Sequence, residues 1–405
     1  MMNDSSDGPH KAYPGNLFSQ ERAALEGLNV SDVVLPATLV EKARTLVYEH
    51  FGESKNTKIA DGYAYGGLGL LAQHTSYYNG FAIILSLSHT TAVVVRPSKL
   101  KLHRVAFEES LSIAPGNKSV EMQLITQLLE KFLPADTFVD VGVVSAIPTG
   151  CLEAFYSSLS VAVVKAVFDF QGVPLPADIC ETTRRVIELA IKSEFSKAFV
   201  LVSLNVEPDM LCVIDTETEE LIPFPAPSKE LLRWGLIELE TETPRNFDFY
   251  HACGELGEKA LKLLQKGEFA RYTSFRDVQH VDLIRVLNAL PRKYRPIVRH
   301  LVNENKRVQA MIGAIRGEDW QKVGGLLYMS HFSLSNEWHG TNKTIDFVVS
   351  EAQGMSTNGM YGACMTGRGG IILTVGLPLA FPVFLKEIKK QLKEQLDREP
   401  SCLLL

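Results

Sequence analysis

The sequence predicts a mixed fold of the α/β (α+β) class, and three observations lead to that expectation. Residues 81–95 form a long apolar run that is rich in β-branched residues in its second half, which is typical of buried strands. Residues 119–132 instead place apolar side chains at helical spacing. The chain of 405 residues is 46% hydrophobic and 22% charged, which is ordinary globular composition with enough apolar material for a sizeable core.

Strands and helices alternate along the first half of the chain. Residues 1–20 are polar and contain proline and glycine, so we expect a disordered tail there. Pro148 ends a buried strand, and helical spacing resumes from Phe155. The expected elements are a helix at 38–51, a strand at 57–65, one or two strands at 81–95, a helix at 119–132, a strand at 138–147, a helix from 155, and two strands at 199–204 and 210–214.

The second half is expected to be mostly helical from 216 to about 353. Val308, Met311, Ile312 and Ile315 form an i, i+3, i+4, i+7 stripe, which is the apolar face of an amphipathic helix. A glycine-rich apolar segment and a last helix follow. We divide the chain into an N-terminal lobe at 21–215, a C-terminal lobe at 216–398 and a C-terminal tail at 399–405.

The charge balance and the lack of targeting signals predict a cytoplasmic protein. There are 41 Lys and Arg residues against 47 Asp and Glu, a net charge of −6, which offers no general attraction to nucleic acid. The first 15 residues lack the apolar stretch of a secretory signal, and no run of 18 apolar residues predicts a transmembrane helix. The six cysteines are scattered without a C-x-x-C pair, so we expect neither a disulfide framework nor a metal site.

The last four residues match a pattern for lipid modification. Cys402 and the three leucines after it fit the C-a-a-X prenylation pattern, and four lysines lie upstream between 386 and 393. Phe384, Ile388 and Leu392 recur every four residues in the same stretch, which predicts a docking helix with the lysines on its solvated face. A weak lipid anchor at Cys402 is therefore the alternative to an unmodified terminus.

Three separated segments carry a family resemblance. Residues 66–80 read GGLGLLAQHTSYYNG, residues 148–150 read Pro-Thr-Gly and run into a helix, and residues 359–370 read GMYGACMTGRGG. In this order they are similar to the signature, the phosphate loop and the glycine-rich third motif of the galactokinase branch of the GHMP small-molecule kinases. The resemblance extends over most of the chain from about residue 60.

The resemblance implies a two-lobed GHMP kinase fold. An N-terminal α/β lobe and a C-terminal α+β lobe would hold ATP and a sugar in the cleft between them. It also implies two sets of ligand-facing residues, one for a substrate and one for a nucleotide cofactor. The substrate set is Gln73, His74, Ser76 and Tyr77, and the cofactor set is Thr366, Gly367 and Gly369.

The phosphate loop departs from the family pattern. The family places small residues and serines where a backbone at a helix N-terminus approaches the phosphates. Here the second glycine position is Leu152, a carboxylate follows at Glu153, and the serine positions are Ala154, Phe155 and Tyr156. Bulk and negative charge both oppose a polyphosphate, so we expect no cofactor, and ATP and magnesium are doubtful. Phe155 and Tyr156 would then be core residues.

The positions that correspond to the family's catalytic and sugar-binding residues also depart from the family pattern. The signature's arginine is Gly67, and its two carboxylates are Gln73 and Ser76. An ungapped count back from Asp215 puts Phe199 at the place of the catalytic aspartate, and phenylalanine cannot orient or deprotonate a hydroxyl.

Two functions of different classes follow from these departures. The first is a catalytically degenerate galactokinase homologue that acts as a small-molecule-binding, regulatory or scaffold protein, with a small molecule or a protein as its partner. The alternative is a repurposed enzyme that uses the old cleft for non-kinase chemistry on a sugar-like or biosynthetic intermediate. The catalytic candidates for that enzyme are His74, Glu153 and Tyr156, three titratable groups near one another in the family geometry.

Overall fold

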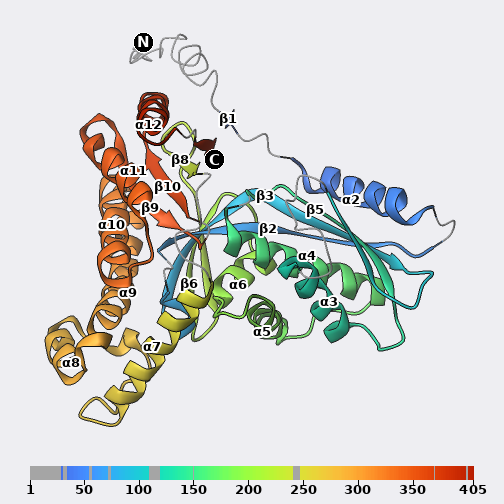
Figure 1. Cartoon of the computed structure of the whole chain (residues 1–405), viewed down its shortest axis with the longest axis horizontal. Helices are drawn as coiled ribbons and strands as arrows, with labels where there is room; N and C mark the ends of the chain where they lie inside the picture. Colours follow the sequence, from blue (N-terminus) through green and yellow to red (C-terminus); the bar gives the residue numbers. More distant parts are fainter. Residues whose placement is uncertain are drawn as a thin grey trace, which may run out of the picture.

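The computed structural model consists of two lobes that lie side by side (Figure 1). The expected tail at 1–20 lies outside the residues that the structure describes, as do Gln73, Thr149, Gly369 and the side chain of Tyr77. The described residues are 29–30, 34–53, 57–71, 74–108, 119–148, 150–239, 247–368, 370–397 and 400–405, without the side chains of 29, 30, 77, 395 and 396.

A six-stranded sheet forms the N-terminal lobe. The long strand β3 lies at its centre and pairs with β2 on one side and with β5 and β6 on the other. Both of its faces are buried, which agrees with the apolar residues at its two ends, 81–85 and 92–95. The strands are β2 (Ala60–Leu71), β3 (Phe81–Pro97), β4 (Arg104–Phe107), β5 (Val139–Ser145), β6 (Met210–Asp215) and β7 (Glu220–Pro225).

Helices cover both faces of this sheet. On one face lies α2 (Pro36–Phe51), and on the other lie α3 (Val120–Phe132), α4 (Leu152–Gln171), α5 (Ile179–Ile191) and α6 (Lys197–Asn205), as Figure 1 shows. Most of α4 is buried because its residues are apolar or small on nearly every face. This helix begins directly after the segment that resembles the phosphate loop.

A second sheet and a layer of helices form the C-terminal lobe. The strand order is β1-β11-β8-β10-β9, with β1 (Asn29–Val30), β8 (Arg233–Glu238), β9 (Met360–Thr366), β10 (Ile371–Gly376) and β11 (Ser401–Leu404). The α-helices are α7 (Phe247–Gln265), α8 (Leu283–Ala289), α9 (Arg295–Arg316), α10 (Trp320–Ser333), α11 (Lys343–Gly354) and α12 (Ala380–Leu396).

Short helical turns complete the chain. The 3₁₀ turns are η1 (Ser76–Tyr78), η2 (Phe275–Asp277), η3 (His280–Asp282), η4 (Arg292–Tyr294) and η6 (Ser356–Asn358), and η5 (Leu334–Trp338) is a π-helical turn that continues α10.

The structure confirms the mixed fold class and most of the expected elements, but it corrects several. Residues 199–204, expected as a strand, lie in helix α6, whose N-cap Ser196 accepts a hydrogen bond from the backbone N–H of Ala198 at 3.2 Å. The region after 216 is mostly helical as expected, but it also contains the strands β7 and β8. The expected tail at 399–405 contains strand β11, which pairs with β8.

One of the three hydrophobic clusters of the described residues extends across both lobes. That cluster includes Leu68 of β2 and Leu159 of α4, and it continues to Met311 of α9 and Leu373 of β10. Strand β7 extends the N-terminal sheet to Pro225, beyond the expected boundary at 215. The lobes are therefore two layered units with a joint interior.

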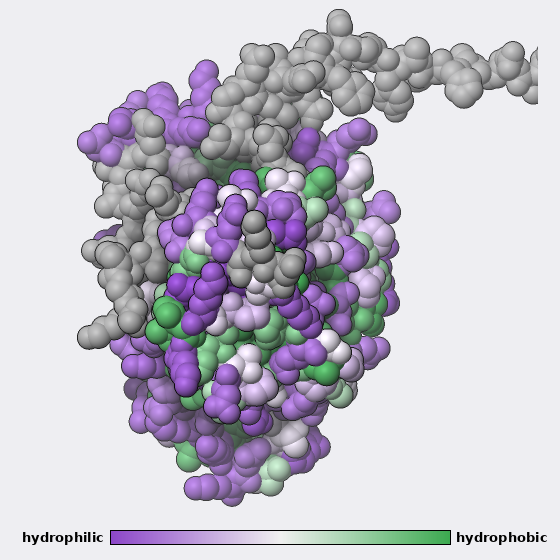
Figure 2. Space-filling view, turned by 90° about the vertical axis from the view of Figure 1, so that its right-hand side faces the viewer, coloured by the Kyte–Doolittle hydropathy of each residue, from purple (hydrophilic) through white to green (hydrophobic). Residues whose placement is uncertain are grey.

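The surface of the N-terminal lobe is of mixed character. Figure 2 shows hydrophilic side chains over most of the face that it presents, with hydrophobic ones in patches among them. None of the helices in the described part of the chain is long and apolar enough to cross a membrane. Cys402 is 4% exposed in β11, so the residue of the C-a-a-X pattern lies inside the second sheet.

Candidate functional site

The three motif segments meet where the lobes join. The Thr366 hydroxyl at the end of β9 donates to the Gly69 carbonyl of β2 at 2.6 Å, and the Cys364 thiol lies 3.9 Å from the carbonyl oxygen of Leu70. The turn that follows Thr366 lies over the first turn of α4, where Glu153 is. The folded chain thus brings together segments 66–80, 148–157 and 359–370, as the resemblance predicts.

A buried ion pair occupies the place expected for phosphate. The Glu153 carboxylate accepts a hydrogen bond from the backbone N–H of Arg368 at 2.9 Å, and its other oxygen lies 3.2 Å from the Arg368 Nε. Glu153 is 9% exposed and Arg368 is 6% exposed. The N-terminus of a helix attracts an anion because its N–H groups and dipole point outward there, and in this protein a carboxylate of the chain itself is that anion.

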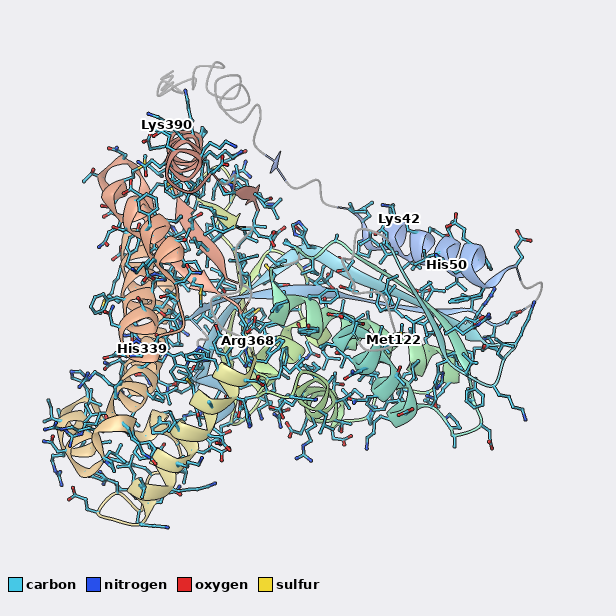
Figure 3. All side chains as sticks on the ribbon, viewed as in Figure 1. Lys42, His50, Met122, His339, Arg368 and Lys390 are labelled. Atoms are coloured by element: carbon cyan, nitrogen blue, oxygen red, sulfur yellow. The ribbon has the colours of Figure 1, made fainter. Side chains whose placement is uncertain are left out.

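Arg368 reaches from the C-terminal lobe into the N-terminal lobe. Figure 3 labels it at the junction of the two. Its guanidinium donates to the Ser193 hydroxyl at 2.9 Å and to the carbonyl oxygen of Glu194, both in the loop between α5 and α6. The Phe247 and Tyr250 rings of α7 lie 5.9 Å and 5.1 Å from the guanidinium carbon. One side chain therefore ties α4, α7 and the α5–α6 loop to the β9–β10 turn.

The backbone around this pair is tightly packed. Gly367 has φ of +64°, and a Cβ placed on it would lie 2.9 Å from a Glu153 carboxylate oxygen. A Cβ on Gly150 would lie 2.6 Å from the Ile371 side chain. Both glycines are required by close approach, and at the predicted cofactor residue Gly367 the Glu153 carboxylate leaves no room for a side chain.

His74 is the predicted substrate residue with the most distinctive environment. It has φ of +66°, and its ring stacks on Trp338 with centroids 4.0 Å apart and an interplanar angle of 1°. The Tyr250 ring lies 5.4 Å away and the His300 ring 6.1 Å away. Burial, followed by the nearby His300 and Arg368, lowers the pKa of His74 well below its usual value, so the imidazole is neutral at pH 7.

The other predicted substrate residues are only partly described. Ser76 is buried in η1, and its backbone carbonyl accepts a hydrogen bond from the Thr216 hydroxyl at 2.9 Å. Its own hydroxyl has no hydrogen-bond partner within the described residues. Gln73 and the Tyr77 side chain lie outside the described residues, so their predicted roles stay predictions.

The three predicted catalytic side chains engage different partners. The Tyr156 hydroxyl donates to Glu121 at 3.2 Å, and burial together with Glu121 raises the pKa of Tyr156. Glu153 pairs with Arg368, and His74 stacks on the Trp338 ring with the Tyr250 ring nearby. The structure thus places the three groups in one region without aiming them at a common reacting atom, and their catalytic role stays a prediction.

The positions that the resemblance assigns to the family's arginine and aspartate adjoin each other. A Cβ on Gly67 would lie 3.6 Å from the Phe199 ring. The same Cβ would lie 2.8 Å from Ile84 and 3.4 Å from Val202. Apolar side chains fill this part of the junction, and Phe199 itself is buried.

Two contributors to the site were missed at the sequence level. Arg368 stands in the third motif, and a cation there beside an anion in the phosphate loop is a signal that could have paired it with Glu153. Trp338 offered no such signal. It lies at the end of the π-helical turn η5, which follows α10, and there its ring meets His74.

Known proteins resemble this chain along most of its length, although no family model matches it. The galactokinase of Streptomyces coelicolor is 24% identical over 321 residues, which are 75% of this chain and 80% of that protein. The galactokinase of Chloroflexus aggregans is 25% identical over 347 residues, which are 80% of this chain and 84% of that protein.

Solved structures share the fold. A galactokinase from Lactococcus lactis, solved with galactose, has a TM-score of 0.76 at 18% identity, with 91% of this chain and 97% of that chain covered. A mevalonate kinase from Staphylococcus aureus has a TM-score of 0.52 at 13% identity, with coverage of 82% and 95%. The chain is therefore similar to galactokinases over most of its length and has the fold of the GHMP kinases.

Proposed function

We propose that this protein is a galactokinase homologue that has lost kinase activity and acts as a small-molecule-binding, regulatory or scaffold protein. The observation that carries the proposal is the buried pair of Glu153 and Arg368 at the N-terminus of α4. In the family this place holds the phosphates of ATP.

Charge opposes nucleotide binding at this place. A polyphosphate would have to approach a carboxylate that is already buried and hydrogen-bonded, and displacing Glu153 would break its contacts with Arg368. Removing one partner of a buried ion pair is costly because the other charge stays desolvated. The residues present therefore do not fit ATP in the family's pose, and we derive no reaction step through it.

The residues at the place of the sugar, which would receive the phosphoryl group, support the same proposal. The names of the relatives describe kinases that act on galactose. In this chain, Phe199 replaces the aspartate that would orient the sugar hydroxyl, and Gly67 replaces the arginine beside it. Ile84 leaves no room for an arginine side chain at position 67 without repacking. Phosphoryl transfer depends on positioned charge, and both charged groups are absent.

Two measurements test the proposal together. The first is thermal unfolding with and without about 5 mM MgATP, because any ligand selective for the folded state raises the Tm. The second is ADP release in the presence of galactose, with the Lactococcus lactis galactokinase as positive control. We expect no rise in Tm and no ADP above background. A clear rise in Tm or galactose-dependent ADP release would overturn the proposal.

A further inference from the structure

A pocket separate from the motif segments lies on the flank of the N-terminal lobe. It is formed by the first half of β2, the C-terminal half of α4 and the end of α6, and its volume is about 510 Å³. None of the residues that line it belongs to the three motif segments. The lining residues are Asp61, Gly62, Tyr63, Tyr65, Lys165 and Asp169, together with 203–207.

Lys165 of α4 brings a primary amine to this pocket. Its side chain is half-buried and makes no ion pair or hydrogen bond within the described residues. Its Nζ atom keeps accessible surface, since it is not among the buried side-chain atoms that lack a partner. A Cβ on Gly62 would lie 2.9 Å from the Lys165 Cβ, so the base of the lysine side chain is packed against β2. A fixed, partly desolvated amine without a counter-ion is the kind of lysine that acts as a nucleophile in proteins.

The protonation of two lining groups suits such a role. Burial lowers the pKa of Lys165, and the Glu207 carboxylate opposes this shift without cancelling it. More of this lysine is therefore a neutral amine at neutral pH than is the case for a lysine in water. Burial, followed by Tyr63 and Glu207, raises the pKa of Tyr65, so its hydroxyl keeps its proton. The pocket thus offers both an attacking amine and a proton donor.

The carboxylates of the lining determine which electrophile fits. Asp61 lies 3.8 Å from Arg44, whereas Asp169 and Glu207 make no ion pair in the described part of the chain. Carboxylates repel an anion, and they accept hydrogen bonds from hydroxyl groups. A neutral carbonyl compound that carries hydroxyl groups therefore suits the pocket, and a keto acid does not.

We propose that this pocket binds a small neutral hydroxy-aldehyde or hydroxy-ketone and that the Lys165 amine condenses with its carbonyl group to an imine. Nζ first bonds to the carbonyl carbon, the C–O double bond becomes single, and a proton moves from nitrogen to oxygen. The C–O bond then breaks as a C–N double bond forms, and the oxygen takes the second amine proton and leaves as water. Nothing is oxidised or reduced. The proposal does not depend on the state of the kinase cleft.

Reductive trapping provides the test. Dihydroxyacetone is added to the full chain at neutral pH together with sodium cyanoborohydride, which reduces an imine to a stable secondary amine. Peptide mass spectrometry then locates the adduct. Lys131, which is exposed in α3, is the internal reference. We expect Lys165 to be labelled faster than Lys131 and at a rate that saturates as the dihydroxyacetone concentration rises. Pyruvate at the same concentration should label Lys165 poorly, because it carries a carboxylate.

Three variants separate a built site from a merely accessible amine. Lys165→Met should abolish the fast, saturating adduct in the mass of the intact protein and leave the Tm nearly unchanged, since it removes a partly desolvated charge. Glu207→Gln removes a carboxylate, so dihydroxyacetone should bind about tenfold more weakly and pyruvate should label Lys165 faster than before. Glu130→Gln, on the exposed side of α3, should change neither rate.

Three results would each overturn the proposal. The first is labelling of Lys165 no faster than that of Lys131. The second is a labelling rate that rises linearly with dihydroxyacetone and does not saturate, which would mean accessibility without binding. The third is equal labelling of Lys165 by pyruvate and dihydroxyacetone.

Discussion

Glu153 and Arg368 are 215 residues apart in sequence and meet through two contacts, a backbone N–H hydrogen bond at 2.9 Å and an ion pair at 3.2 Å. Because Glu153 lies in the first turn of α4 and Arg368 lies between β9 and β10, the pair joins the two lobes at the point where the family binds phosphate. The pair should stabilise the folded protein, and it should also oppose the binding of another anion at the N-terminus of α4. These two effects can be measured separately.

Removing the carboxylate should destabilise the protein. In Glu153→Ala the Arg368 guanidinium keeps its hydrogen bonds to Ser193 and the Glu194 carbonyl but loses its buried counter-ion, and breaking a buried pair in this way costs about 3 kcal/mol. Urea unfolding measures the loss. The same variant leaves an uncompensated cation at a helix N-terminus, so sulfate or phosphate should raise its Tm more than that of the natural sequence.

A double-mutant cycle checks that the pair itself is responsible. Arg368→Met supplies the second single variant, and the double variant completes the cycle. We expect a coupling energy of about 1–3 kcal/mol, since the effects of substituting two residues in direct contact on the free energy of unfolding do not simply add. Strict additivity of the two single effects would mean that the two side chains do not interact.

The Gly67 position should reject even a methyl group. A Cβ there would lie 2.8 Å from Ile84, so Gly67→Ala should cost about 1–3 kcal/mol through overpacking. Gly325→Ala is the matched control, because Gly325 lies inside α10 with nothing within 4 Å of an added Cβ. That change should raise the free energy of unfolding by up to about 1 kcal/mol. Equal effects of the two substitutions in urea unfolding would contradict the packing argument.

The sequence predicted best where one local signal dominated. The run at 81–95 is long, apolar and β-branched, and it forms the central strand. The run at 199–204 is also apolar, but it lies in the nine-residue helix α6, which is largely buried. Such a short buried helix cannot be told from a buried strand by periodicity.

The same limit applies to the site. Glu153 could be recognised as foreign to a phosphate loop from the motif alone. Its partner Arg368 and the Trp338 ring over His74 could not be assigned, because those contacts depend on tertiary packing between distant segments.

The buried His74 should make stability depend on pH. Its pKa in the folded protein lies well below the ordinary value, chiefly through burial, with His300 and Arg368 adding to the effect. Below pH of about 6.5 the unfolded chain takes up a proton that the folded protein does not, so stability falls as pH falls.

The variant His74→Asn isolates this contribution. Asparagine tolerates the positive φ of the position and does not titrate. The stability advantage of the natural sequence over the variant should shrink by up to about 1.4 kcal/mol per pH unit between pH 6.5 and 5. His89 and His103, whose pKa values burial also lowers, are the same in both proteins and cancel. A difference that stays constant with pH would contradict the assignment to His74.

The cysteines should be unreactive until the protein unfolds. All six are buried, and burial raises the pKa of Cys402 to about 11. Few thiolates are therefore present at pH 8, and none should react quickly with an aromatic disulfide reagent. Six should react after addition of guanidinium chloride. The Cys402→Ser variant is the control, with five thiols when unfolded and none fast when folded. A single fast thiol that disappears in Cys402→Ser would mean instead that β11 separates from β8 in the folded protein, and only that opening would give a prenyltransferase access to Cys402.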